Sequence, residues 1–371
     1  MLHVINNLGS GGAENLISEM LPIMNNIKGV EVDLLLLTDK NNVFDKKLKE
    51  KGIKIEIVPK RKLYSPYNIF YIKDFIIKNK YDIVHAHLFP TIYWVSLASK
   101  LIFKNKPKFI MTEHSTHNKR REKKYLRFLE RKIHFNYDKI ISISQKAQEN
   151  LILWLNPNEK HLNKFIIIEN GINVEKFIKA KPYLKREINK KFTEDIKLIC
   201  MVSRFSEQKD HPTVIKSLKE LPENVHLILV GEGKLKSKNI KLASEIGVNK
   251  RVHFLGFRND IPRILKTVDV VVLSSNWEGF GLAAVEGMSA GLPVIASDVP
   301  GLNEIVKNAG LLFSKGNSSE LASKINELIM NRDKYNEISK KCLFKAYKYD
   351  IRKMTKNYIN LYEQFYKSSF K

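Results

Sequence analysis

Short apolar runs alternate with longer, periodic segments along the first half of the chain. Between positions 15 and 24, for example, apolar residues recur every three or four positions, which predicts one buried helical face. We expect strands at 2–6, 30–37, 53–58, 83–86, 108–112 and 139–144, and helices at 15–24, 44–51, 68–79 and 92–103. Near-continuous apolar strands separated by helices are typical of a parallel sheet covered on both faces.

The second half repeats this plan after a polar, Lys-rich stretch over 179–195 that suits a connector. Asp210 is expected to cap a helix that begins at His211, and Gly247 is expected to end the helix that begins at Leu235. The strands expected here are 197–202, 226–230, 252–254, 269–273, 293–296 and 311–313. We therefore predict an α/β protein with two doubly wound domains, 1–175 and 176–348, followed by a helical tail over 349–371.

Chemically distinctive motifs follow the predicted strands of both halves. They are Gly9–Glu14, His85–His87, Glu113–His114, Arg204 with Lys209, and Glu278–Glu286. Ligands of open α/β sheets bind beyond the carboxyl ends of the strands, so we expect one shared site in a cleft between the two domains. Strand alternation points His85 and His87 to the same face.

Two of these motifs narrow the chemistry. The glycine turn after Glu278 exposes backbone N–H groups at a helix N-terminus, where a phosphate or a sugar hydroxyl can be held. The Gly9–Glu14 loop also precedes a helix, but Glu14 stands where the dinucleotide fingerprint has Gly or Ala, which disfavours a hydride-transfer enzyme. A plain tight turn remains an alternative for this loop.

Taken in order, the motifs resemble those of glycosyltransferase family 4, the retaining enzymes of the GT-B fold, whose Glu-x7-Glu signature matches Glu278 and Glu286. The resemblance implies two Rossmann-like domains facing across a cleft, with the tail crossing back onto the N-terminal domain. It implies transfer of a hexose from a nucleotide sugar, with a UDP-sugar favoured, to a lipid-linked or surface-polysaccharide acceptor, with retention of configuration.

The resemblance also assigns roles. His87, Arg204, Lys209 and Glu278 are implied to be catalytic, with Arg204 and Lys209 replacing the metal that other glycosyltransferases hold with an Asp-x-Asp pair, a tripeptide that this sequence lacks. The implied donor-binding residues are Gly11, Gly12, Arg204, Lys209, Gly231, Arg258, Glu278, Phe280, Gly281, Leu282 and Glu286. His114 is expected on the acceptor side, and neither a cofactor nor a metal is expected.

Simpler explanations exist for several of these residues. Arg204 and Lys209 are two cations in a chain that has 64, and His87 has the alternative of a structural role. His114 lies in a loop that is polar in any case.

Within the implied donor site, Glu278 is expected to bind the hydroxyls of the donor sugar and Glu286 those of the ribose, with the base near Gly231 and Arg258.

The net charge of +25 indicates an anionic partner. About half of the excess lies between Lys60 and Lys132, and the densest part, 119–132, has the pattern of a basic amphipathic helix. We expect it to lie on an anionic membrane. The alternatives are an ordinary solvated face and nucleic-acid binding, for which the sequence has no recognisable motif.

Hydrophobic residues make up 43% and charged residues 28%, as in a soluble protein. The start of the chain has no signal-peptide pattern, and the apolar run 91–103 is interrupted by Lys100 and too short to cross a bilayer. Cys200 and Cys342 have no metal-type spacing and fit a reducing compartment. We expect a cytoplasmic protein, peripheral on the inner face of the membrane; the alternatives are the same fold with a soluble acceptor and an inactive nucleotide-sugar sensor.

Overall fold

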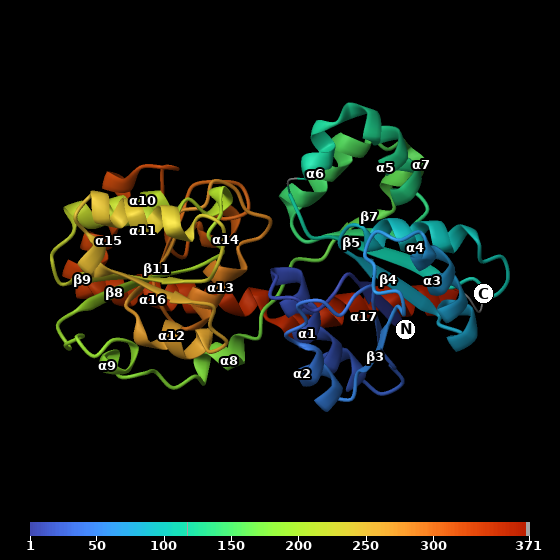
Figure 1. The fold of residues 1–371 in the computed structure, drawn as a ribbon, viewed down its shortest axis with the longest axis horizontal. Helices are drawn as coiled ribbons and strands as arrows, with labels where there is room; N and C mark the ends of the chain where they lie inside the picture. The colour runs from blue at the N-terminus through green and yellow to red at the C-terminus, as the bar shows by residue number, and fades with distance from the viewer. Residues whose placement is uncertain (117, 369–371) are drawn as a thin grey trace. The chain divides into compact units, whose positions relative to one another are not determined.

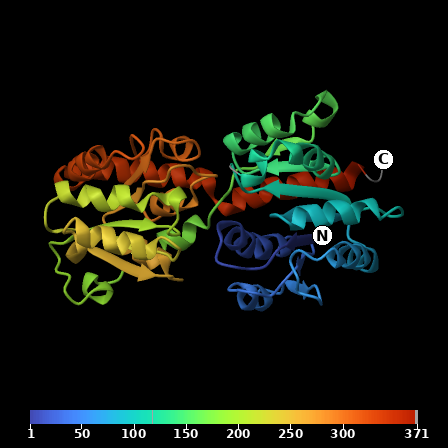
Figure 2. The ribbon, with the colours of Figure 1, turned by 45° about the horizontal axis from the view of Figure 1, so that its top comes forward.

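The computed structural model describes residues 1–116 and 118–368, and the chain divides into two compact units (Figure 1). The first unit comprises Met1–Gly171 and Ile351–Lys371, and the second comprises Ile172–Asp350. Each unit has its own parallel sheet with helices on both faces (Figures 1 and 2).

The first unit contains a seven-stranded sheet in the order β3-β2-β1-β4-β5-β6-β7, and the strand pairs are parallel. Its strands are β1 (Leu2–Ile5), β2 (Asp33–Leu36), β3 (Lys54–Ile57), β4 (Ile83–His87), β5 (Lys108–Glu113), β6 (Lys139–Ser142) and β7 (Phe165–Ile167). The order reverses beside β1, so the loops after β1 and β4 diverge and leave room for a ligand at the carboxyl edge.

Two hydrophobic cores cover the two faces of this sheet. The helices are α1 (Gly12–Asn25), α2 (Asp45–Glu50), α3 (Tyr67–Asn79), α4 (Thr91–Lys100), α5 (Arg127–His134), α6 (Gln145–Leu155), α7 (Glu159–Leu162) and α17 (Ile351–Ser368). Alternation along the strands divides the cores: Leu2 and Val4 pack toward α3, α4 and α6, whereas Ile5 packs toward α1 and α17. The second of these faces also carries the histidines described below.

The second unit contains a six-stranded parallel sheet in the order β10-β9-β8-β11-β12-β13. Its strands are β8 (Lys197–Val202), β9 (Val225–Val230), β10 (Val252–Gly256), β11 (Val270–Leu273), β12 (Val294–Ser297) and β13 (Leu311–Phe313). Its helices are α8 (Val174–Ile178), α9 (Lys185–Ile188), α10 (His211–Ser217), α11 (Lys236–Glu245), α12 (Ile261–Thr267), α13 (Leu282–Ser289), α14 (Asn303–Val306), α15 (Ser318–Met330) and α16 (Arg332–Ala346).

The chain leaves and re-enters the first unit at neighbouring points. A Cβ atom on Gly171 would lie 2.9 Å from Cα of Ile351, a separation that only glycine permits. Just beyond, Ile172 N–H donates to the carbonyl of Tyr349 over 2.9 Å within the second unit. From Ile351 onward the chain forms α17, which packs beside α1, so the helical tail returns to the N-terminal unit as expected.

The predicted strands and the predicted α/β class are confirmed, but three details differ. The short strand β7 was not predicted, and Asp210 adopts a left-handed conformation (φ 45°) without capping the backbone of α10. The continuous basic helix predicted over 119–132 is wrong: two 3-10 turns, Lys119–Glu122 and Lys124–Leu126, precede α5. Among the described helices, none is both long enough and apolar enough to pass through a bilayer.

Candidate active site

In the first unit, the glycine-rich loop after β1 leads directly into α1. Gly11 is the N-cap residue, with extended backbone, and Gly12 is the first helical residue and is exposed. A Cβ atom on Gly11 would lie 2.2 Å from Oε2 of Glu14, so this carboxylate lies against the loop. Gly11 and Gly12 therefore lie at the positively polarised end of α1, where backbone N–H groups can meet an anion.

Three imidazoles form a hydrogen-bonded chain that ends at the carboxyl edge of the first sheet. Nδ1 of His3 lies 3.0 Å from Nε2 of His87, and Nδ1 of His87 lies 3.1 Å from Nε2 of His114. His85 stacks on His87 with ring centroids 4.2 Å apart, which confirms that these two side chains share a face. His87 is thus held from both sides.

The C-terminal helix α17 supplies the other contacts of this cluster. The Tyr362 hydroxyl lies 2.6 Å from Nδ1 of His85, and Oγ1 of Thr112 lies 2.8 Å from its Nε2. Tyr358 lies 3.4 Å from the same threonine hydroxyl. Both nitrogens of His85 are therefore engaged within the core, which gives His85 a structural role beneath His87.

Burial keeps these imidazoles neutral. Burial lowers the pKa of His3 to about 3 and that of His114 to about 4, and it lowers the pKa of His87 well below its ordinary value. A neutral imidazole donates one hydrogen bond and accepts one. His87 at neutral pH is therefore an uncharged group of fixed orientation.

The same cluster has the composition of a transition-metal site, because the ligand nitrogens of His3, His85 and His87 lie within 4.8 Å of one another. Both nitrogens of His85 and both of His87 are already hydrogen bonded to protein groups. A metal ion would have to displace several of these bonds. We therefore interpret the cluster as a hydrogen-bonded chain.

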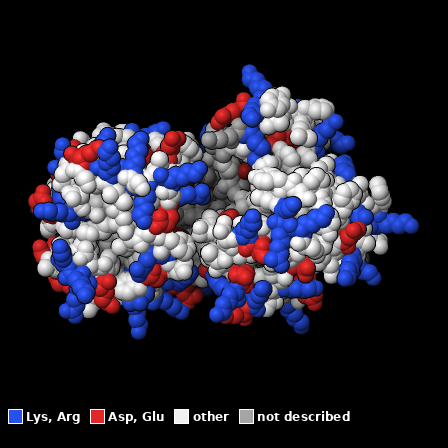
Figure 3. Space-filling model, in the orientation of Figure 1, with Lys and Arg blue, Asp and Glu red and all other residues white. Residues whose placement is uncertain are grey.

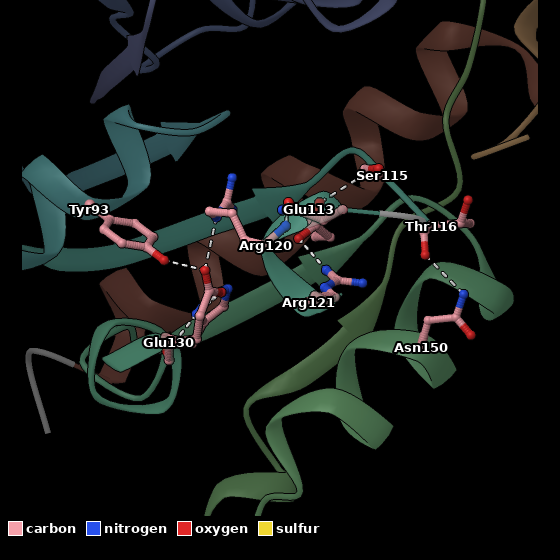
Figure 4. A network of polar contacts seen from close by, with 10 residues as sticks. Tyr93, Glu113, Ser115, Thr116, Arg120, Arg121, Glu130 and Asn150 are labelled. Carbon is pink, nitrogen blue, oxygen red and sulfur yellow. Dashed lines mark hydrogen bonds and ion pairs between the residues drawn. The ribbon is translucent and has the colours of Figure 1, made fainter. Parts of the chain in front are cut away.

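Two buried ion pairs hold the segment that follows β5 (Figure 4). Arg121 Nη2 lies 2.7 Å from Oε2 of Glu113, and Arg120 Nε lies 3.0 Å from Oε1 of Glu130, which also accepts from the Tyr93 hydroxyl. Both arginine side chains are mostly buried and each is paired with a carboxylate, so they contribute little charge to the surface. The carboxylate at 113 fixes the start of the loop that carries His114.

In the second unit, the loops after β8 and β9 touch backbone to backbone. A Cβ atom on Gly231 would lie 2.1 Å from the carbonyl oxygen of Ser203, and one on Gly233 would lie 2.4 Å from that of Phe205. Both glycines have positive φ (141° and 156°). The structure therefore requires glycine at both positions and holds the Arg204 backbone against the loop after β9.

The two predicted cations of this unit differ in their surroundings. Arg204 is exposed, and within the described residues its guanidinium has no hydrogen-bond or ion-pair partner. Lys209 is mostly buried and its Nζ forms an ion pair with Oε1 of Glu278. The structure thus brings Lys209 and Glu278 together, although 69 residues separate them.

The Glu278 carboxylate is also held by its own loop. The Ser275 hydroxyl donates to Oε1 of Glu278 over 2.9 Å, and a Cβ atom on Gly301 would lie 2.5 Å from the Glu278 carbonyl oxygen. Gly301 has φ 89°, so glycine is needed there for both reasons. Glu278 is 7% exposed and sits between a cation and a hydroxyl donor.

The N-terminus of α13 lies directly after this carboxylate. Gly281 caps the helix in a left-handed conformation (φ 89°), and Leu282 begins it. The first N–H groups of a helix have no partner within the helix, so those at the start of α13 can bind a ligand anion. Phe280 is buried with its ring edge-on to Tyr349 at 5.3 Å, which anchors the turn from below.

Further along α13, Glu286 lies in a poorly solvated place. Its side chain keeps some exposure, yet burial raises its pKa to about 7, opposed only in part by the charge of Lys176 on α8. A carboxylate with so high a pKa is stabilised by any ligand that donates hydrogen bonds to its charged form. Functional carboxylates often have such perturbed values.

Arg258 is a further predicted residue whose side chain already has a partner. Its Nε lies 2.7 Å from Oδ1 of Asp260, and its Nη2 pairs with the other carboxylate oxygen. The Tyr183 hydroxyl donates to the same carboxylate over 2.5 Å. The structure therefore gives Arg258 a role in ordering the loop after β10, and the predicted donor contact would require this pair to open.

Sequence reasoning missed His3 and Ser275. His3 stands alone in an apolar strand, and its relation to His87 appears only when β1 pairs with β4, which places His3 beside His85. Ser275 lies three residues before Glu278 in a loop whose path the sequence pattern does not specify. The available signal was that His3 is a histidine inside an otherwise apolar predicted strand, and the neighbouring position of that strand and the His85–His87 strand comes from the structure.

Comparison with known families covers nearly the whole chain. Residues 10–176 match the family described as Glycosyltransferase Family 4, and residues 184–342 match the family described as Glycosyl transferases group 1. The Escherichia coli UDP-Gal:alpha-D-GlcNAc-diphosphoundecaprenol alpha-1,3-galactosyltransferase is 32% identical over 283 residues, which cover 71% of this chain and 70% of that protein.

Two further proteins illustrate the range of similarity. The Campylobacter jejuni N,N'-diacetylbacillosaminyl-diphospho-undecaprenol alpha-1,3-N-acetylgalactosaminyltransferase is 28% identical over 56% of each chain. The crystal structure of Anabaena Alr3699/HepE in complex with UDP-glucose superposes with a TM-score of 0.83 at 22% identity, covering 98% of this chain and 99% of that one. This superposition shows the shared GT-B fold.

The raised pKa of Glu286 predicts a pH-dependent stability. In the unfolded chain a glutamate ionises near pH 4.5, whereas here it ionises near pH 7, so stability is lost as pH rises through this window. Between pH 5 and pH 8, the free energy of unfolding of the wild type should therefore fall by about 3 kcal/mol because of Glu286. Glu286→Gln should abolish this fall. Urea unfolding at both pH values, with the exposed Glu194→Gln as control, measures it; equal pH slopes in all three proteins would refute the assignment.

Proposed function

Since the chain belongs to the group 1 glycosyltransferases of family 4, we propose that it transfers a hexose from a nucleotide sugar to a lipid-linked or surface-polysaccharide acceptor, with retention of configuration. A UDP-sugar is the favoured donor, because the Escherichia coli relative is named for UDP-galactose and the Anabaena structure holds UDP-glucose. The acceptor class follows the two relatives named for diphosphoundecaprenol-linked sugars.

The observation that carries this proposal is the arrangement of Lys209, Glu278 and the α13 N-terminus within the second unit. When the sugar leaves a diphosphate, negative charge grows on the phosphate oxygens, and preorganised cations and N–H groups stabilise it. Arg204, which is exposed and has no partner in the described part of the chain, is free to join Lys209 there. Glu278 then binds hydroxyls of the sugar.

Glu286 takes the ribose of the donor in this scheme. A ribose diol donates two hydrogen bonds, and an ionised carboxylate accepts both. Because the pKa of Glu286 is raised to about 7, the donor binds best above that pH, where the carboxylate is charged. Gly231 and Gly233 keep the neighbouring loop close to the backbone at Arg204, and we place the base beside these glycines.

On the first unit, His87 serves the transferred sugar and His114 the acceptor. A neutral imidazole held by His3 and His114 positions a hydroxyl but does not supply a charged acid at neutral pH. A double displacement would need a second carboxylate on the opposite face of the sugar, and we assign no residue to that role. We favour same-face attack by the acceptor hydroxyl, with its proton passing to the departing phosphate.

We place the protein at the inner face of the membrane through a surface that we call the 123–132 surface. It consists of Lys123, Lys124, Tyr125, Phe128, Leu129 and Lys132. Tyr125 is 75% and Phe128 67% exposed, which is unusual for aromatic rings. Lys123 and Lys124 directly precede Tyr125 in the sequence, and Nζ of Lys132 lies 4.3 Å from the centre of the Phe128 ring. Lys and Arg are otherwise spread over the face seen in Figure 3, with Asp and Glu among them. Exposed rings with lysines at their border suit an anionic lipid surface.

Replacing Arg204 by Ala should lower the rate of transfer at least tenfold, and by up to about 10³-fold if the full 2–4 kcal/mol of a preorganised donor is lost. The fold should be unaffected, because the side chain is exposed. Steady-state transfer and thermal unfolding measure the two effects. Arg186→Ala, an exposed arginine on α9 of the same unit, is the matched control; unchanged turnover in a folded Arg204→Ala protein would refute the role.

Transfer should continue in saturating EDTA, because Arg204 and Lys209 supply the positive charge and the sequence has no Asp-x-Asp tripeptide. Initial rates before and after chelation test this. Loss of activity that Mg²⁺ or Mn²⁺ restores would contradict it. If only Zn²⁺ restored the lost activity, and if the His3→Gln variant did not respond to Zn²⁺, the histidine chain would instead be a metal centre.

Changing Lys123, Lys124 and Lys132 together to Gln should weaken binding to phosphatidylglycerol vesicles at low salt by roughly 100-fold, since each cation near such a surface contributes about 1 kcal/mol. Co-sedimentation measures binding, and hydrolysis of the donor should stay unchanged. Lys28, Lys46 and Lys51 changed to Gln are the control of equal charge. Equal vesicle binding by the wild type and by the variant changed at Lys123, Lys124 and Lys132 would contradict the membrane role and favour the alternative of a soluble acceptor.

A further inference from the structure

A second group of polar side chains lies at the other half of the carboxyl edge of the first sheet. It lines an open surface pocket of about 600 Å³ beyond the carboxyl ends of β1, β2 and β3, which we call the cavity. The side chains that matter here are Asn7, Lys40, Arg61, Lys62, Tyr64 and Ser65. None of the roles assigned above uses this cavity.

The cavity is positively charged. Its lining includes three cations and no carboxylate. The Arg61 guanidinium lies 2.5 Å from Oδ2 of Asp39, which offsets one charge. Lys40 and Lys62 have no ion-pair partner within residues 1–116 and 118–368, so two positive charges remain for a ligand.

The loop that carries Arg61 and Lys62 is held in a strained conformation. Arg61 has φ 47°, in the left-handed region that a non-glycine residue rarely adopts. The buried Asn68 donates from Nδ2 to the carbonyls of Lys62 and Leu63, both over 3.1 Å, and Trp94 Nε1 donates to Leu63 over 2.9 Å. Strain that several contacts enforce is found most often at ligand sites.

The opposite wall is fixed as well. Asn7 Nδ2 donates to the carbonyl of Lys40 over 2.9 Å, which joins the loop after β1 to the loop after β2. Helix α3 begins just beyond the cavity, and the Ser65 hydroxyl accepts from the Tyr67 N–H over 3.4 Å at that end. The positive end of the helix adds to the field of the lysines.

The cavity adjoins the loop that carries His87. The Tyr64 ring lies 6.2 Å from the ring of Phe89, two residues beyond His87. Asn6, next to Asn7, donates to the carbonyl of Phe89 over 2.8 Å. A ligand whose anionic part occupies the cavity therefore extends toward the histidine chain.

We propose that this cavity binds the phosphate or diphosphate of the acceptor, with Lys40 and Lys62 as its direct partners. The inference rests on the proposed glycosyl transfer and specifies its acceptor as a phosphate-linked sugar. Ammonium groups bind phosphate as point charges, and a fixed loop reduces the entropy cost of binding.

The test uses the full-length protein saturated with UDP, so that the donor phosphate site is filled, and inorganic diphosphate as the probe in calorimetry. Wild type should bind diphosphate, and a Lys40→Gln, Lys62→Gln double variant should bind it at least tenfold more weakly. Lys28→Gln with Lys78→Gln changes the same charge at the opposite end of the unit and should bind like wild type. No diphosphate binding by UDP-loaded wild type, or equal binding by the double variant, overturns the proposal.

Farnesyl diphosphate distinguishes the two sources of the phosphate. Tighter binding than inorganic diphosphate supports a lipid-linked acceptor, and equal binding supports a soluble phosphorylated one; in both cases the double variant must lose it. In transfer assays, the double variant should raise the KM for a diphosphate-linked acceptor at least tenfold, with UDP affinity unchanged. These results are independent of Arg204→Ala, so failure of the cavity and failure of the donor site can be told apart.

Discussion

The close approach of backbones in the second unit is the constraint on which its candidate site depends. At Gly231, Gly233 and Gly301, a Cβ atom would lie within 2.5 Å of a neighbouring carbonyl oxygen. Glycine at these positions therefore lets the loop after β9 approach the loop after β8, and the loop after β12 approach the loop after β11. This spacing lets Lys209 reach Glu278 from a different strand. Preorganisation of this kind means that the charges are in place before a ligand arrives, at no cost during the reaction.

The first unit reaches a comparable rigidity by hydrogen bonding. His3, His87 and His114 are neutral because they are buried, and neutral imidazoles can be linked without repulsion. The segment after β5 is instead held by charged groups, because each of its two buried carboxylates is paired with one arginine. Removing either arginine would leave an unpaired buried charge, which is far more destabilising than removing a surface cation.

The parallel sheets could be predicted from the sequence, because strand periodicity is a local signal, and so could the position of the motifs after strands, whereas the roles of the motif residues stay predictions. The ion pair between Lys209 and Glu278 was not predicted; it forms because the two residues follow β8 and β11, which the structure places next to each other. The inward orientation of Arg120 and Arg121 could not be predicted, since a pattern of charges does not reveal buried partners as far away as Glu113 and Glu130. The cavity at Lys62 depends on a left-handed residue and a buried asparagine, which periodicity does not encode.

Helix α17 has a consequence for the order in which the chain acquires its structure. The second unit is one continuous segment, Ile172–Asp350, and contains all the residues that its sheet requires. The first unit lacks one wall until Ile351–Ser368 has been made, because Tyr358 and Tyr362 complete the core around His85. During synthesis from the N-terminus, the first unit is therefore completed only after the whole of the second unit has been made, and its histidines stay uncovered until Ile351–Ser368 has been added.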